Sequence, residues 1–429
     1  MEMICVTGAG NSTQSTPTLR QGTFVALRHR NFRLMWISLI VSNSGTWLQT
    51  VAQDFLVYQV THSAWILGLV NGVRAVALIG LAFVGGTIAD RLDQRKLLIF
   101  TQSCMAVTAA ALGLLIQLHM IQVWHIIVIS FINALLLAVD QPARQSLLPR
   151  LVPREDLMNA VALNSVTFTG AAAFGPALAG PVIATMGMTS GFYLNALSFF
   201  VVIWAVWAIR LPAATVRRQP EPVGEAIVSG LRYVRSSPTI LLLVSLLTVF
   251  SFFATPYQAT LPVFAERVFG GGVTVLGNLR AAMGIGALVG GFLLARFATF
   301  PRKDWLVVGG CLAYSAALLA FSATGWLPGA VALLFTGSLV MTVFQSTAQT
   351  LMQQVTADHM RGRVMSLFAV SVIGMWPLGS LPMGWATDKF GAPAAVAGGA
   401  AIAGVFALVL AAQARRLLAP SAGKIAENA

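Results

Sequence analysis

The feature that most constrains this sequence is the length of its uncharged stretches. Residues 97–139, 157–209 and 305–357 contain no Asp, Glu, Lys or Arg at all. A helix needs about 20 apolar residues to cross a hydrocarbon core of about 30 Å, so each stretch has room for two spans. Only 10% of the whole chain is charged, against about 25% in soluble domains. The sequence therefore predicts an integral membrane protein and excludes most soluble enzymes and nucleic-acid binders.

The remaining apolar segments complete the predicted fold, an all-α membrane protein. The further expected spans lie near 34–60, 65–89, 237–264, 273–297, 364–387 and 393–414. Together with two spans in each uncharged stretch, they predict twelve transmembrane helices.

The basic residues predict which end of each helix faces the cytoplasm. Of the 27 Lys and Arg residues, all but Arg74, Arg267, Arg280 and Lys389 fall in the tails or in alternate loops. Cytoplasmic loops carry an excess of Lys and Arg, so we expect both termini in the cytoplasm. Arg74, Arg280 and Asp54 are then the only charges at membrane depth.

A weak internal repeat divides the chain into two halves. At an offset of 204–206 residues, Gly85-Gly86 aligns with Gly290-Gly291, and Arg74 aligns with Arg280. Two parallel six-helix repeats are typical of transporters that rock one half against the other around a central site. The predicted units are a disordered tail (1–23), a first six-helix half (24–210), a cytoplasmic linker (211–236), a second half (237–416) and a tail (417–429).

A motif after the second predicted span identifies a resemblance. The segment Gly86-Thr-Ile-Ala-Asp90-Arg91-Leu-Asp93-Gln-Arg95-Lys96 resembles the G-x-x-x-D-R-x-G-R-R-K signature of the major facilitator superfamily, with Asp93 at the place of a family glycine. Asp90 can cap a neighbouring helix, and Arg91 and Arg95 could pair with Asp140 as a cytoplasmic gate. The alternative is a loop of cytoplasmic positive charges without a switching role.

A second motif lies in the fifth predicted span. The segment from Gly170 through Gly175-Pro176 to Gly180 resembles a signature of antiporters in the same superfamily. Small residues at this spacing also let helices pack closely, and ordinary packing is the alternative.

The segment 141–157 and span 1 resemble the drug and metabolite:proton antiporter branch that includes the enterobactin exporter and macrolide efflux pumps. This resemblance covers about residues 24–416. It implies a monomeric secondary transporter of the bacterial inner membrane that exports a small organic molecule as protons enter, without a cofactor. One departure is that residues 126–139 lack the arginine that many such antiporters carry in span 4.

Asp54 is the candidate proton-coupling residue, because a carboxylate inside a span is costly and usually functional. Its predicted partner is Arg74, which lies at a similar depth; a static structural pair is the alternative. Arg74 and Arg280 with a single acid would leave a positive cavity, suited to an anionic or catecholate-like cargo. In the other interpretation, each Arg bonds backbone carbonyls. The further predicted cavity residues are Asn43, Trp47 and Gln53.

Other classes of function find less support. The sequence has no phosphate-binding G-x-x-x-x-G-K-[ST] loop, no cysteine or histidine spacing typical of a metal site, and no nucleophile–base set at membrane depth. We therefore expect no enzyme and no nucleic-acid partner. Within transport, the alternatives are a lipid or lysolipid flippase, a uniporter or an importer of the same fold.

Overall fold

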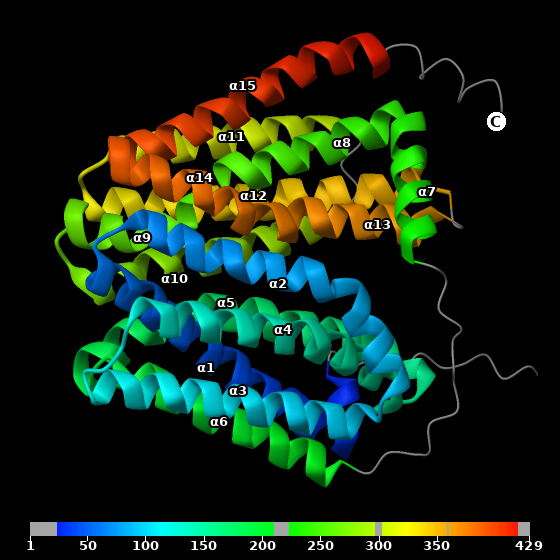
Figure 1. Ribbon diagram of the computed structural model, residues 1–429. Coiled ribbons are helices and arrows are strands. Elements are labelled where there is room, and N and C mark those ends of the chain that lie inside the picture. The colour runs from blue at the N-terminus through cyan, green and yellow to red at the C-terminus, as the bar shows by residue number, and fades with distance from the viewer. Residues whose placement is uncertain (1–23, 210–222, 297–302, 358–359, 419–429) are drawn as a thin grey trace, which may run out of the picture.

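The computed structural model of the protein describes residues 24–209, 223–296, 303–357 and 360–418 (Figure 1). Some side chains within these ranges are not described, among them those of residues 79 and 82–91. The predicted tails and the first part of the predicted linker lie outside the described residues.

The first half of the chain forms one helical bundle. Its helices are η1 (Val25–Arg28), α1 (Arg30–Thr61), α2 (Ala64–Arg91), α3 (Gln94–Gln117), α4 (Val123–Leu147), η2 (Leu148–Arg150), η3 (Arg154–Asp156), α5 (Leu157–Met186) and α6 (Thr189–Ala208). The break between α5 and α6 falls at Gly187, whose φ of 82° is one that few side-chain-bearing residues adopt.

The second half forms another bundle, in which two long helices contain π-helical turns. Its elements are α7 (Val223–Ser236), α8 (Pro238–Val249), η4 (Phe250–Ala254), α9 (Tyr257–Val263), η5 (Phe264–Val268), α10 (Gly272–Arg296), α11 (Lys303–Ala323), α12 (Leu327–Val355), α13 (Arg361–Ala369), η7 (Val370–Gly374), α14 (Met375–Phe390) and α15 (Ala392–Leu418). Residues 238–268 and 361–390 are each one continuous candidate span.

Ten helical segments in the described part of the chain are long and apolar enough to cross a membrane. The expected count of twelve is therefore met only in part. Helix α2 contributes a shorter apolar stretch, Ala64–Leu78, and α1 is not among the ten. Residues 34–53 of helix α1 carry no charge, but their many Ser, Thr, Asn and Gln side chains lower the mean hydropathy of this stretch.

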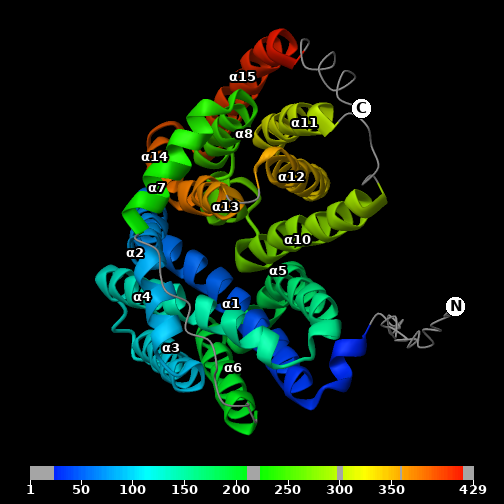
Figure 2. The same cartoon turned by 90° about the vertical axis from the view of Figure 1, so that its right-hand side faces the viewer.

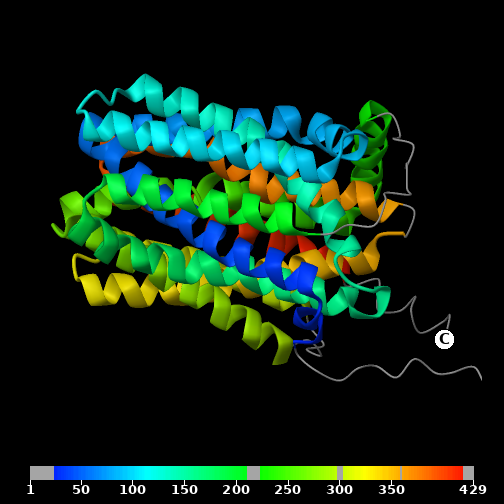
Figure 3. The same cartoon turned by 90° about the horizontal axis from the view of Figure 1, so that it is seen from below.

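The bundle has two ends, and the helices run between them (Figures 1 and 3). We call the end with the short connections α1–α2, α3–α4, α5–α6, α11–α12 and α14–α15 the turn end. The opposite end, with residues 92–93 and 148–156, Ala357 and Met360, is the loop end. Helix α7 stands across the loop end in Figure 1, where Arg363 Nη1 donates to Ser229 Oγ at 2.7 Å.

The two halves meet mainly through two helix pairs, α5 with α10 and α2 with α14, which lie side by side in Figure 2. In the first pair, a Cβ added to Gly277 would lie 3.0 Å from the carbonyl oxygen of Pro176. In the second, a Cβ on Gly68 would lie 2.3 Å from the carbonyl oxygen of Ser380. All four residues lie toward the turn end of their helices, so the halves are in contact there.

Candidate functional site

A buried ion pair joins the two halves. Asp54 of α1 is 5% exposed, and its Oδ2 accepts a hydrogen bond from Nη2 of Arg280 in α10, which is 9% exposed. Arg280 Nη2 also lies 3.5 Å from the carbonyl oxygen of Gln258, while its Nε has no hydrogen-bond partner in the described structure. The prediction that Asp54 pairs with Arg74 is wrong, because α10 brings Arg280 against α1.

Arg74 of α2 is the third charge of this cluster. It is half-buried and close enough to interact electrostatically with both Asp54 and Arg280. No hydrogen bond to Arg74 is found within the described residues, and a guanidinium group carries five N–H donors. The cluster contains two guanidinium groups and one carboxylate, and its net charge is positive when all three are ionised.

The neighbouring predicted cavity residues differ in what they contact. Gln53 is buried and donates to Ser130 Oγ of α4 at 3.0 Å, so it joins two helices of the same half. Trp47 packs on α5, where a Cβ added to Gly175 would lie 2.6 Å from the Trp47 Cβ. Asn43 is half-buried one turn before Trp47. A role of these three residues in binding cargo stays a prediction.

Two described residues of the predicted cytoplasmic gate, Asp140 and Arg95, have partners other than each other. Asp140 is 1% exposed and accepts hydrogen bonds from Thr101 Oγ1 at 2.7 Å, Gln102 Nε2 at 2.8 Å and Arg144 Nε at 2.5 Å. All its partners belong to α3 and α4, whereas Arg95 donates to the carbonyl oxygen of Trp207. The expected pair between Arg95 and Asp140 is therefore absent among the described contacts.

The rest of the gate motif is only partly described. The side chains of Gly86, Asp90 and Arg91 lie outside the described residues. Asp93 stands where the superfamily has a glycine, and its Oδ1 accepts from the backbone N–H groups of Arg95 at 2.9 Å and Lys96 at 3.0 Å. Asp93 therefore caps α3, which gives this departure from the superfamily pattern a local structural role.

The glycines of the α5 motif have different neighbours. A Cβ added to Gly180 would lie 3.1 Å from Cα of Thr274 in α10, and Gly175 faces Trp47 of α1. A Cβ on Gly170 would meet nothing within 4 Å. Close helix packing therefore accounts for Gly175 and Gly180 but not for Gly170. Whether the motif also serves antiport is not tested by these contacts.

Asp388 is a cross-half residue that the sequence analysis did not single out. It lies at the turn end of α14, and its carboxylate accepts three hydrogen bonds from residues 63–65 at the start of α2. The signal in the sequence is the segment Gly384-Trp-Ala-Thr-Asp388-Lys389, which has the same spacing as Gly86-Thr-Ile-Ala-Asp90-Arg91.

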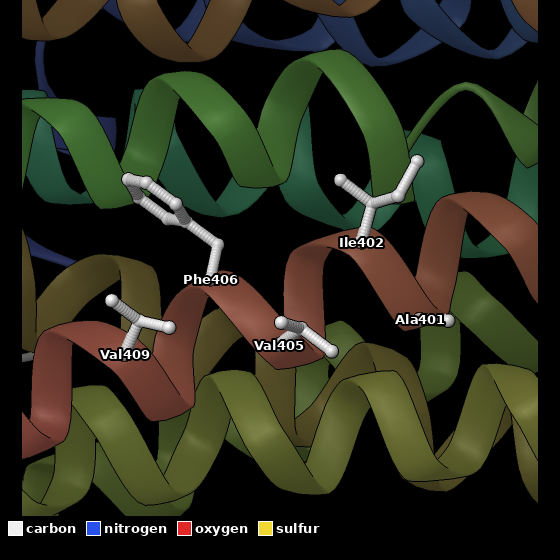
Figure 4. A pocket seen from close by; sticks show the side chains of 5 residues that line it. All are labelled: Ala401, Ile402, Val405, Phe406 and Val409. Carbon is white, nitrogen blue, oxygen red and sulfur yellow. The ribbon is translucent and has the colours of Figure 1, made fainter.

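A groove on α15 does not belong to this cluster. It has a volume of about 430 Å³ and only apolar lining residues (Figure 4): Ala401, Ile402, Val405, Phe406 and Val409. Among the described residues, no group of three or more His, Cys, Asp or Glu side chains is placed to hold a metal ion. The three charges of the Asp54 cluster are thus the best candidate for function.

Comparisons with known proteins agree with this architecture. The profile of a family described as transmembrane secretion effector matches residues 21–426. A staphyloferrin A transporter of Staphylococcus aureus is 27% identical over 357 residues, which cover 81% of this chain and 87% of the relative. The enterobactin exporter EntS of Escherichia coli O1:K1 is 27% identical over 375 residues, or 83% of this chain and 85% of the relative.

Solved structures show the same fold at low sequence identity. A bacterial homologue of the human lysosomal transporter Spinster, in an inward-facing and unoccupied conformation, has a TM-score of 0.70 at 16% identity. The match covers 89% of this chain and 96% of that one. The nucleoside transporter NupG has a TM-score of 0.69 at 11% identity and covers 89% and 98% of the two chains.

Proposed function

We infer the mechanism of this chain from the premise that it belongs to the transmembrane secretion effector family of the major facilitator superfamily. It is accordingly a multi-pass membrane protein and a secondary transporter that exports small molecules, not an enzyme. We propose that its cargo is a siderophore-like anion and that protons drive its export. The observation that carries this proposal is the buried ion pair between Asp54 and Arg280.

The proposed topology has twelve spans and both termini in the cytoplasm. Helices α1 and α2 would join the ten candidate spans, and the concentration of Lys and Arg at the loop end supports a cytoplasmic position for that end. In a bacterial host, the membrane would be the inner membrane. The turn end then faces outward, and contact between the halves at that end corresponds to a conformation closed to the outside.

Proton coupling follows from the position of Asp54 between the halves. A buried carboxylate that keeps its charge needs its cation, and loss of one partner costs about 3–5 kcal/mol. Protonation would instead neutralise Asp54 and release Arg280 from the opposite half. A proton from the outer side would thereby change the balance between the two states of the transporter, which is how a ligand shifts a conformational equilibrium.

The charge of the cluster supports an anionic cargo. With Arg280 bound to Asp54, that pair is neutral overall, and the net positive charge of the cluster is that of Arg74. A guanidinium group can bind a carboxylate or another planar oxygen pair through two parallel hydrogen bonds. The two curated relatives are named for staphyloferrin A and enterobactin, and this supports a siderophore-like molecule. We propose a monomer as the working unit, because one chain contains both halves.

The test is proton flux in proteoliposomes under an imposed pH gradient. Wild type, Asp54→Asn and Asp156→Asn would be compared with catecholate, carboxylate, macrolide and lipophilic cargoes. Asp156 is the matched control, because it is 5% exposed and its Oδ2 lies 2.7 Å from Nε2 of His29, within one half. We expect cargo-dependent proton movement in wild type and Asp156→Asn only.

The contrary result would be transport that ignores both the gradient and the Asp54→Asn change. Asp54 would then be a structural residue, and a uniporter or lipid flippase would become the better description. Transport that requires the gradient but accepts only neutral cargo would reject the anionic substrate and leave proton coupling in place.

A further inference from the structure

Helices α2 and α14 come from opposite halves and touch backbone to backbone near the turn end. Ser380 Oγ donates to the carbonyl oxygen of Gly68 at 3.1 Å. One turn further along α14, a Cβ added to Gly384 would lie 2.4 Å from the carbonyl oxygen of Ala64. Gly68 and Gly384 have no side chain, so the two helix backbones can approach closely. This close approach brings the residue one turn beyond Gly384 within reach of the start of α2.

That side chain is Asp388, which caps α2 from the other half. Its Oδ1 accepts from the backbone N–H of Ala64 at 2.7 Å, and its Oδ2 accepts from the N–H of Trp65 at 3.0 Å and from Ser63 Oγ at 2.6 Å. The first N–H groups of a helix have no partner within the helix, so they must be satisfied from outside. Here a residue more than 300 positions away satisfies two of them.

We propose that Asp388 is an outer latch, a positioning residue that holds the turn end closed and must release α2 each time that end opens. The contact joins the halves at the point where they would separate, unlike caps that lie within one half. Lys389 does not neutralise the latch, because its Nζ lies over the ring of Trp385, 5.1 Å from the centroid.

A second cross-half contact at the same end supports the latch. Arg267, next to the end of η5, donates to the carbonyl oxygen of His62 at 3.2 Å, and its guanidinium carbon lies 5.6 Å from the ring centroid of Tyr58. Both contacts hold the α1–α2 corner of the first half to the second half. Closure at the turn end is thus built from surface contacts as well as from the buried pair of Asp54 and Arg280.

The strength of the contact suits a gate that must open repeatedly. Asp388 and Trp65 are exposed, so water can replace the carboxylate when the helices part. Loss of an N-terminal cap shifts a helix equilibrium by about fivefold in typical cases. A contact that changes the equilibrium by about this factor favours the closed turn end and still allows the turn end to open.

The sequence suggests a relation between this latch and the proposed cytoplasmic gate. Gly384 and Asp388 of α14 have the same four-residue spacing as Gly86 and Asp90 of α2, and a basic residue follows each aspartate. The two motifs lie at opposite ends of the α2–α14 pair.

The experiment measures distances between the halves in nanodiscs without cargo. Spin labels on Leu118→Cys and Ala323→Cys would report the turn end, and labels on Met158→Cys and Val355→Cys the loop end, after replacement of the three native cysteines. We expect Asp388→Ala, which removes every bond that the carboxylate accepts from residues 63–65, to raise the population with a wide turn end about fivefold. The loop-end distances should shorten in the same fraction of molecules.

The matched control is Gln122→Ala. Gln122 is the N-cap residue of α4 at the turn end, and its side chain accepts a hydrogen bond from Trp124 Nε1 at 2.7 Å within the same half. An equal shift in the control, or unchanged distances in Asp388→Ala, would overturn the latch. Should Asp388→Ala fail to fold, Asp388→Asn keeps one acceptor oxygen and replaces the other, and its smaller shift must still exceed that of the control.

This outcome is separate from the proposed cargo and driving ion. The distance measurement uses neither cargo nor a pH gradient, so a failed latch would leave the proton-coupling proposal as it was. Conversely, a transporter that does not use protons would still show the shift if Asp388 holds its outer end.

Discussion

Asp54 and Arg280 are separated by 226 positions in the chain and form one buried ion pair. Because each residue belongs to a different half, the pair contributes to the stability of the fold and also to the equilibrium between the conformations of the transporter. A charged pair within one half would contribute to the stability of the fold alone. Variants of Asp54 and Arg280 should therefore change both stability and transport.

Removal of one member of the pair should destabilise the protein more than removal of both. Arg280→Gln or Asp54→Asn leaves a buried charge without its partner, and we expect a loss of about 3–5 kcal/mol in the free energy of unfolding. The double variant should recover part of that loss. Thermal unfolding of the four proteins in detergent gives the coupling energy, and additive losses would indicate that the pair is not formed.

Acidic pH should partly rescue Arg280→Gln. In this variant Asp54 has lost its cation, and protonation removes the buried negative charge that destabilises the fold. The difference in melting temperature between Arg280→Gln and wild type should therefore shrink as pH falls. The same pH series on Asp54→Asn is the control, because that variant has no carboxylate to protonate; an equal trend there would contradict the explanation.

Arg74→Gln should weaken anionic cargo with little effect on stability. Arg74 makes no hydrogen bond within the described structure, so its loss removes no internal contact of that kind. A hydrogen bond to a charged group contributes about 1.5–3 kcal/mol, which corresponds to at least tenfold weaker binding. Titration of anionic and neutral cargo into both proteins tests this expectation. Equal losses for both cargoes would assign Arg74 a structural role.

Two glycines of the same motif should respond differently to a larger side chain. In Gly180→Val the new side chain meets the backbone of α10, and overpacking costs about 1–3 kcal/mol. Gly170→Val places its Cβ in open space. Melting temperatures compare the two variants. A transport defect in Gly170→Val at normal stability would favour the antiporter interpretation of the motif, whereas normal transport would favour packing alone.

Asp140→Asn should lower stability in either conformation. The carboxylate collects hydrogen bonds from three side chains of its own half, including Arg144, and the amide cannot accept all of them. We expect a loss of about 1–3 kcal/mol. Unchanged unfolding with a shifted distribution of loop-end distances would instead support the predicted gate.

Hydropathy and charge along the chain were sufficient to predict an all-helical membrane protein and to single out Asp54 as the acidic residue inside a predicted span. These are properties of one helix at a time, because each residue advances the chain by about 1.5 Å along the helix axis. The turn at Gly187 follows from the same local logic, since glycine adopts its backbone conformation without strain.

The partners of the charged residues depended on tertiary structure. Depth along the helices favoured Arg74, which the repeat aligns with Arg280, but the packing of α10 against α1 makes Arg280 the partner of Asp54. Likewise, the bond between Asp388 and the start of α2 forms only because α14 packs against α2 in the folded protein. Depth is encoded along the sequence, whereas the direction in which a side chain points across the bundle is decided only when the two halves pack.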